Sequence, residues 1–401
     1  MDEQTKILVA GTGPVGLLAA LRLADLGLTV TLAGPAARRD DRRTTALMLP
    51  ALDMLDTVGV LDALRPLAAP LKTMRILDAT SRLVRSPMVT FRASEIGAES
   101  FGLNIPNGAL NAALETAVEA HPSIRWTKSL IAAWDIDAAE ARAECPDGSI
   151  LRAELVVAAD GRMSPAREAV GITTYTRAYP QAALVLNFGH SREHAFTSTE
   201  FHTETGPFTQ VPLPGNRSSL VWVVKPEDAD TLFALDDATL SRRVEDRMQS
   251  MLGRVTVEPG RQIYPLQAVL PTRFARNRVA LVGEAAHVFP PIGAQGLNLG
   301  IRDVSDLAGI VSENLDCLGE PEILATYDRK RRPDILARAG AVNLLNMSLL
   351  SDMLPAQLAR SAGLGFVGGF APLRALFMRE GLQPGSGISS FVAELGKKVG
   401  R

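Results

Sequence analysis

Cysteine is scarce in this sequence, and the cysteines it has lack the spacing of metal ligands. Cys145 and Cys317 are the two cysteines and lie in unrelated contexts. This excludes a disulfide framework and a cysteine-based zinc site, and it fits a reducing compartment. Among His190, His194 and His202, the first two have the i, i+4 spacing of helical metal ligands, but they lie near a strand-like stretch without an accompanying acidic motif. We therefore interpret them as exposed or hydrogen-bonded residues and predict no metal site.

The chain also lacks an excess of charge of one sign and any long hydrophobic run. Its formal net charge of −2 exerts no pull on nucleic acid or anionic lipid. No uncharged apolar run is long enough to span a bilayer. The start Met1-Asp2-Glu3-Gln4 lacks the basic and apolar regions of a secretion signal. We expect no nucleic-acid partner and a cytoplasmic protein, with membrane contact at most peripheral, at the inner face of a membrane.

The first informative motif is Gly11-Thr12-Gly13-Pro14-Val15-Gly16. It follows the apolar run 6–10 and precedes an apolar-periodic stretch over 15–26, so it lies between a predicted strand and a predicted helix. In that position the free amides and the positive dipole end of the helix bind a pyrophosphate. Glycine-rich turns also serve plain packing, but the strand and helix on either side favour a dinucleotide site.

The acid that usually completes such a site is missing. A second strand is expected over 28–32, and a Rossmann site normally has an acid at its end that binds the adenosine ribose. Gly34 occupies this position, and the nearest carboxylates in sequence are Asp40 and Asp41. Either a backbone group or a later residue holds the ribose, or the adenosine is bound more weakly than usual.

Two further candidate ligand-binding segments follow predicted strands. With the motif at 11–16 as the first station, the segments that begin at Asp160 and at Gly283 are here named the second and third stations. The run 155–159 leads into Asp160-Gly161, which taken alone is typical of a turn. The run 278–282 leads into Gly283-Glu284-Ala285-Ala286-His287, and the segment 290–298 leads into a helix expected over 299–311. A carboxylate at a strand end is typical of ligand sites in open α/β sheets. Amides at the start of the later helix stabilise negative charge.

A second glycine-rich match lies at 363–368. It follows a helical-looking stretch rather than a strand, so we interpret it as a terminator or packing element of C-terminal helices. The apolar stripe of these helices favours a core or subunit interface. It leaves open a homo-oligomer and contact with a membrane or a biosynthetic complex.

Together the three stations resemble the flavoprotein aromatic hydroxylases of the p-hydroxybenzoate hydroxylase type, most closely the ubiquinone-biosynthesis hydroxylases. The resemblance covers nearly the whole chain. It is also carried by Arg43-Thr44-Thr45-Ala46-Leu47, Asn107-Gly108-Ala109-Leu110, Glu200-Phe201, Gly206-Pro207, the stretches 211–214 and 220–222, and the block from Gly283 to Asp303. It implies an α/β fold, with a Rossmann-like FAD/NAD(P)-binding domain, an inserted mixed β-sheet substrate domain and a helical C-terminal region.

With 401 residues, the chain exceeds the size of a single core. We assign 1–72, 103–178 and 270–320 to a discontinuous FAD-binding domain, 73–102 and 179–269 to the substrate domain, and 321–401 to the helical region. Segments such as 182–186 and 219–224 suit one face of a sheet that forms an apolar pocket. Tyr264 is a candidate pocket residue, but the pattern favours a buried structural role.

The resemblance implies roles for individual residues. Glycines of the first motif approach the FAD pyrophosphate, Arg43 lies against the cofactor, and Asp160 lies near the pyrophosphate and the nicotinamide cofactor. Glu284 bonds the ribitol, and Gly296, Leu297 and Asn298 bring backbone amides to the flavin ring. The expected cofactor-binding set is Gly11, Gly13, Pro14, Val15, Gly16, Arg43, Asp160, Gly283, Glu284, Pro291, Gly293, Ala294, Gly296, Leu297 and Asn298.

The implied reaction has two halves. NAD(P)H binds transiently and reduces FAD, after which dioxygen forms a flavin hydroperoxide that hydroxylates an aromatic substrate. The resemblance implies a phenolic ring of a quinone precursor, with or without a prenyl chain. The protein positions the ring and excludes water; no catalytic acid or base is named.

Two alternatives remain open. One is an FAD reductase or halogenase of the same fold, and the other is a non-catalytic assembly subunit with weakened FAD binding. Three departures from the family pattern motivate the second: Gly34, Gly108 where an arginine is frequent, and Glu284 where an aspartate is usual.

Overall fold

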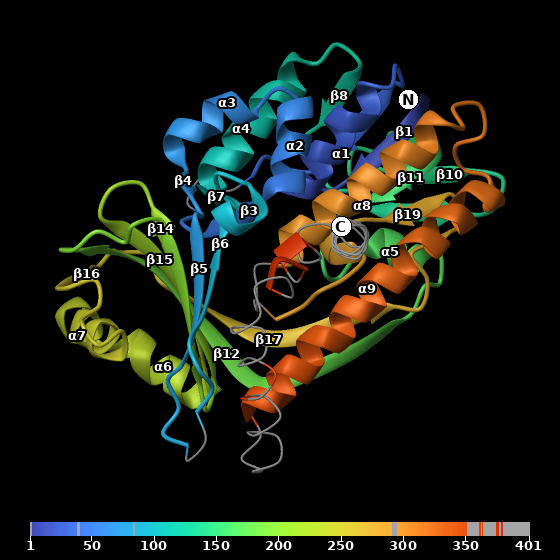
Figure 1. The fold of residues 1–401 in the computed structure, drawn as a ribbon. Coiled ribbons are helices and arrows are strands. Elements are labelled where there is room, and N and C mark those ends of the chain that lie inside the picture. The colour runs from blue at the N-terminus through green and yellow to red at the C-terminus, as the bar shows by residue number, and fades with distance from the viewer. Residues whose placement is uncertain are drawn as a thin grey trace, which may run out of the picture.

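The computed structural model describes residues 2–37, 41–82, 85–290 and 295–350, with 361, 363, 374–376, 378 and 379. Figure 1 shows two large sheets side by side, with most helices gathered around the first of them. A third, small sheet lies between these layers and consists of β3 (Thr44–Met48), β7 (Gly102–Pro106) and β4 (Ala69–Pro70). The fold is α/β, as predicted.

The first sheet has a parallel centre in the order β19-β11-β1-β2-β8. Its middle strands are buried on both faces, as parallel strands covered by helices are. Its parallel strands are β1 (Asp2–Ala10), β2 (Val30–Ala33), β8 (Ile124–Thr127), β11 (Ile150–Ala158) and β19 (Val279–Leu281), and its antiparallel edges are β9 (Ala133–Ile136), β10 (Ala141–Glu144) and β18 (Ala275–Arg276). β2 begins two residues after the predicted start, within the usual scatter of strand ends.

Helices α1 (Pro14–Ala24), α4 (Asn107–Ala120) and α8 (Gln295–Ser312) pack around this sheet. Pro14 suits the first position of α1 because its ring sets the helical φ and its missing N–H has no partner there. α1 is buried on nearly all sides, and the small side chains of Ala19 and Ala20 allow the close approach. α8 begins at Gln295, earlier than the predicted start at Leu299.

The second sheet has the order β16-β12-β15-β14-β13-β5-β6, with β17 paired to β12. It is mixed, because β13 and β5 are parallel while the other pairs are antiparallel. Its strands are β5 (Thr73–Asp78), β6 (Val89–Arg92), β12 (Thr174–His190), β13 (Thr197–Thr203), β14 (Gly206–Leu213), β15 (Arg217–Val224), β16 (Val255–Val257) and β17 (Gln262–Pro271). Helices α6 (Pro226–Ala234) and α7 (Asp237–Arg247) cover one face (Figure 1).

The remaining elements connect these layers. They are α2 (Leu49–Thr57), α3 (Leu61–Leu64), α5 (Pro165–Ala169), α9 (Pro321–Leu350) and the short 3-10 helices η1 (Arg65–Leu67), η2 (Ala93–Ile96) and η3 (Gly283–Ala285). α9 packs against α8 and the β18–β19 edge of the first sheet. Among the described residues, no helix combines the length and the apolar character needed to cross a bilayer.

Candidate cofactor and substrate site

Three neighbouring strands of the first sheet end at the three stations found in the sequence. β1 leads to Gly11, β11 to Asp160 and β19 to Gly283, and parallel pairing brings these ends to one edge. Gly11 has φ +109°, and a Cβ there would lie 2.2 Å from the Ala159 oxygen and 2.8 Å from the Asp160 nitrogen. Glycine is therefore required where the first two stations meet.

The first and third stations also touch. A Cβ on Gly283 would lie 3.2 Å from both methyl groups of Val15 in α1. A Cβ on Gly300 in α8 would lie 2.6 Å from a Val15 methyl and 3.1 Å from the Gly283 Cα. Val15, Gly283 and Gly300 thus form one close contact that sets the spacing between α1, the loop after β19 and α8. Gly300 carries no motif signal, so sequence reasoning missed its role.

Two helix N-termini border this contact. Gly13 is the extended N-cap of α1, with no side-chain cap and no acidic residue in the first turn. Gly296 lies in the first turn of α8. A Cβ on either glycine would meet nothing within 4 Å in the described part of the chain. Internal packing therefore does not demand glycine at these two positions, whereas close approach of a ligand to the helix ends would.

The other residues predicted in and just before α8 fall into three groups. Leu297 packs partly buried against the main core. The Asn298 side chain ties α8 to β3, because its Oδ1 accepts from the Met48 amide at 2.9 Å and its Nδ2 donates to the Ala46 oxygen at 2.8 Å. Pro291, Gly293 and Ala294 lie outside the described residues, as does all of the 363–368 match except Gly363.

One carboxylate oxygen of Asp160 has no hydrogen-bond partner among the described residues. This is the buried Oδ1, whereas Oδ2 accepts from the Ala166 amide at 3.0 Å. Burial raises the pKa of the Asp160 carboxyl, and hydrogen bonds from Ser164 and Ala166 partly oppose this. The neighbouring Arg167 is buried and donates to the Ala285 oxygen at 2.9 Å, which joins the second and third stations.

Arg43 is held in a defined place beside these stations. Its Nε and one terminal nitrogen donate to the two Asp41 oxygens at 2.8 and 2.7 Å, and its guanidinium lies over the Tyr264 ring, 5.5 Å from the centroid. Asn107 also donates to Asp41 at 3.3 Å. Burial alone would raise the pKa of Asp41, but the hydrogen bonds hold it below its ordinary value. The Asp41 hydrogen bond raises the pKa of Arg43, with smaller contributions from Tyr264 and Glu284. Tyr264 is partly buried rather than fully buried as predicted.

One face of the second sheet meets this arginine segment. In β12 and β15 the cross-strand pairs Ala183–Val223, Val185–Val221 and Asn187–Ser219 point to the same side, because alternate residues of a strand share a face. Asn187 donates to the Arg42 oxygen at 2.9 Å, and Thr44 donates to Ser219 at 2.8 Å. A hollow at this junction is lined by Arg42, Arg43, Val185, Leu186, Asn187, Pro259, Gly260 and Gln262. The apolar pairs Ala183–Val223 and Val185–Val221 therefore extend the lining of this hollow away from Arg43 along the sheet.

The three histidines of the second sheet region have protein partners. The His190 ring nitrogens lie 2.7 Å from the Arg192 oxygen and 3.0 Å from the Ser218 hydroxyl. His194 bonds the Leu213 oxygen at 2.9 Å, and His202 bonds Glu200 at 2.8 Å. Burial lowers the pKa of His190. These contacts fit the predicted reading of hydrogen-bonded histidines.

Comparison with known proteins places the fold and the motifs in a family. Residues 4–339 match the FAD binding domain family. A ubiquinone hydroxylase, UbiL, of Rhodospirillum rubrum is 34% identical over 391 residues, which cover 95% of this chain and 90% of the relative. The chain belongs to the FAD-dependent aromatic hydroxylases. The 3-demethoxyubiquinol 3-hydroxylase of Escherichia coli is 29% identical and covers 90% of this chain and 94% of its own.

Solved structures share the fold of this hydroxylase. The p-nitrophenol 4-monooxygenase PnpA of Pseudomonas putida superposes with a TM-score of 0.74 at 23% identity, over 95% of this chain and 97% of its own. PqsL of Pseudomonas aeruginosa, in complex with 2-aminobenzoylacetate, has a TM-score of 0.76 at 23% identity, over 91% of this chain and 100% of its own.

The three departures from the family pattern have local structural settings. At Gly34, φ is +149° and a Cβ would lie 2.9 Å from the Thr12 side chain, so no acid fits there. A carboxylate reaches the same loop from α4, where Glu115 accepts from the Ala37 amide at 2.6 Å. A Cβ on Gly108 would lie 3.4 Å from the backbone oxygen of Asp41. The side chain of Glu284 is exposed.

Proposed function

We propose that this hydroxylase adds oxygen to the ring of a phenolic, prenylated precursor of a quinone, with NAD(P)H and dioxygen as co-substrates. The observation that carries the proposal is the meeting of Gly11, Asp160 and Gly283 at one sheet edge beside the apolar face of the second sheet. The substrate class rests on the names of two relatives, a ubiquinone hydroxylase and a 3-demethoxyubiquinol 3-hydroxylase.

The proposed FAD site uses the residues predicted from the sequence. Gly11, Gly13, Pro14, Val15 and Gly16 would hold the pyrophosphate at the α1 N-terminus, where amides and the helix dipole favour an anion. Asp160 would lie near the pyrophosphate and the nicotinamide cofactor. Arg43, Gly283 and Glu284 would border the ribitol and the ring, and α8 from 296 to 298 would approach the flavin. Two features of the structure fit this cofactor: the leftover Oδ1 of Asp160, and the open space beside Gly13 and Gly296.

When bound, FAD would supply the electron transfer and oxygen activation that protein side chains cannot provide. The chain itself would bind and orient the aromatic ring against the face formed by Ala183, Val185, Val221, Val223 and Leu266, a face that is poor in charge. Excluding water from this face would keep reduced oxygen from escaping as hydrogen peroxide. Domain boundaries at 72/73, 102/103, 178/179, 269/270 and 320/321 are part of this proposal.

The test is oxygen labelling with purified, FAD-loaded protein. NADH and NADPH are each supplied in ¹⁸O₂ with a prenylated phenol, and the matched control is the same phenol without its prenyl chain. We expect a mass increase of one ¹⁸O atom in the prenylated ring, coupled to oxidation of the nicotinamide, and a lower yield with more hydrogen peroxide for the control. If the nicotinamide is oxidised but hydrogen peroxide is the only oxygen product with either phenol, the result would contradict hydroxylation and favour a reductase. FAD binding that fails in folded protein would favour the assembly subunit.

A further inference from the structure

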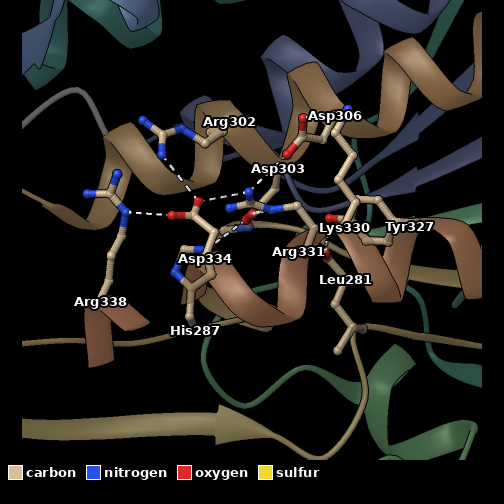
Figure 2. A network of polar contacts seen from close by, with 11 residues as sticks. Leu281, His287, Arg302, Asp303, Asp306, Tyr327, Lys330, Arg331, Asp334 and Arg338 are labelled. Atoms are coloured by element: carbon tan, nitrogen blue, oxygen red, sulfur yellow. Dashed lines mark hydrogen bonds and ion pairs between the residues drawn. The ribbon is translucent and has the colours of Figure 1, made fainter. Parts of the chain in front are cut away.

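A fully buried carboxylate links the third station to α8 and α9. Asp303 of α8 has no exposed surface. Its Oδ2 accepts from the Gly283 amide at 2.9 Å and from Nε2–H of His287 at 2.7 Å. Its Oδ1 accepts from Nε–H of Arg331 in α9 at 2.7 Å. One side chain thus holds both ends of the segment 283–287, here named the cofactor loop, and the helix that covers it (Figure 2).

Arg331 is the buried cation of this cluster. Its side chain is 1% exposed, and it also donates to Asp306 at 2.9 Å and to Asp334 at 3.0 Å. Burial alone would lower the pKa of Arg331, but the surrounding anionic groups raise it above its ordinary value. Arg302, Lys330 and Arg338 contact the outer carboxylates at the partly exposed rim of the cluster (Figure 2). Arg331 therefore carries its charge in the folded protein at any ordinary pH.

A second contact joins α9 to the strand that precedes the cofactor loop. Tyr327 is buried, and its hydroxyl donates to the Leu281 oxygen of β19 at 2.7 Å. Tyr327 and Arg331 lie one helical turn apart, so they share a face of α9. That face contacts both the strand before the cofactor loop and the carboxylate that holds the loop itself.

The cost of burial indicates what the pair does. Two buried opposite charges are seldom more stabilising than well-packed apolar residues of the same volume, whereas removing one partner is strongly destabilising. An apolar contact between α8 and α9 would hold the helices together but would bind neither the Gly283 amide nor the His287 ring. What the Asp303 carboxylate adds is a defined position for the cofactor loop, and what Arg331 adds is a counter-charge that holds the carboxylate in place.

We propose that Asp303 and Arg331 are positioning residues that hold the cofactor loop in its binding conformation, so that FAD affinity depends on the docking of α9. The inference rests on the proposed FAD site, because the loop it concerns is the one assigned to the cofactor. It assigns no contact with FAD to either residue. Their effect passes through the Gly283 amide and the His287 ring.

The test compares Arg331→Met with Lys330→Gln in the full chain. Lys330 is the matched control because it neighbours Arg331 on α9 and pairs with Asp306 at 3.0 Å, yet its side chain is half-exposed and does not contact Asp303. FAD affinity is measured by flavin fluorescence, thermal unfolding is followed without FAD, and the visible spectrum of bound flavin is recorded. We expect R331M to raise the Kd for FAD about tenfold or more and to change the spectrum. K330Q should leave the Kd within twofold of wild type and the spectrum unchanged.

Arg331→Lys keeps the experiment decisive if R331M does not fold. Lysine retains the buried charge but lacks the forked guanidinium with which Arg331 contacts three carboxylates at once. R331K should therefore give a Kd between those of wild type and R331M. A lower unfolding temperature with an unchanged Kd and spectrum in R331K or R331M would overturn the proposal and leave the pair a stabilising element only. Failure of the wild type to bind FAD would instead overturn the proposed cofactor site, so the two failures are distinct.

Discussion

Replacing Gly300 with alanine tests the contact between the first and third stations. The new Cβ would lie 2.6 Å from a Val15 methyl and 3.1 Å from the Gly283 Cα. Ordinary carbon contacts are about 3.5–4.0 Å, so α8 must move by about 1 Å away from α1 and the cofactor loop. Valine cannot easily yield, because its branched Cβ restricts rotation of the side chain.

The expected energy change combines two opposing effects. Overpacking of this kind costs about 1–3 kcal/mol. Exchanging glycine for alanine inside a helix returns about 1 kcal/mol. Gly300→Ala should therefore lose up to ~2 kcal/mol of unfolding free energy, and its FAD affinity should fall about tenfold because three bordering segments shift together.

Gly309→Ala is the matched control on the same helix. Gly309 is exposed, and a Cβ there would meet nothing within 4 Å in the described structure. The control should gain about 0.5–1 kcal/mol and bind FAD like wild type. Urea unfolding of the apoprotein and fluorescence titration with FAD give both quantities. If G300A matched G309A in stability and in FAD affinity, the close packing of Val15, Gly283 and Gly300 would not control the site.

Three further predictions use the same assays. Gly296→Ala should leave stability equal or higher but weaken FAD binding, because its Cβ enters open space at the start of α8; unchanged affinity would place the ligand elsewhere. Asp41→Asn should destabilise the apoprotein at pH 7. The pKa of Asp41 is lowered on folding, so its contribution is present above the unfolded value of 3.8 and is lost as pH falls through the folded value. The gap to wild type should therefore shrink by pH 3, and a constant gap would contradict this. Glu115→Ala should weaken FAD binding by releasing the Ala37 loop, whereas Glu119→Ala, which removes a half-exposed ion pair on the same helix, should not; equal effects would remove Glu115 from the site.

The sequence predicted the parts of the site that depend on local pattern. Apolar runs that end in Gly11, Asp160 and Gly283 indicate strands with ligand-binding ends, and parallel pairing brings such ends together. The start of α8 was placed too late, because the glycine-rich segment before Leu299 has low helix propensity and tertiary contacts overrode it.

Contacts between distant elements could not be predicted in this way. Gly300 looks like any helical glycine until Val15 is seen against it, and Arg331 looks like a surface residue within a run of charged residues. Glu115 lies far along the chain from the missing ribose acid at Gly34, and only the fold brings it to that loop. An acid on the apolar face of a predicted helix, as at Asp303, is the sequence signal that could have indicated the network, because the structure buries that face.

A crystal structure of the chain with FAD would show whether the first and third stations hold one FAD molecule. We expect the pyrophosphate beside the amides of 13–16 at the α1 N-terminus, and the flavin ring near residues 296–298 and Arg43. FAD absent from crystals at saturating concentration, or bound with its pyrophosphate away from α1, would contradict this expectation.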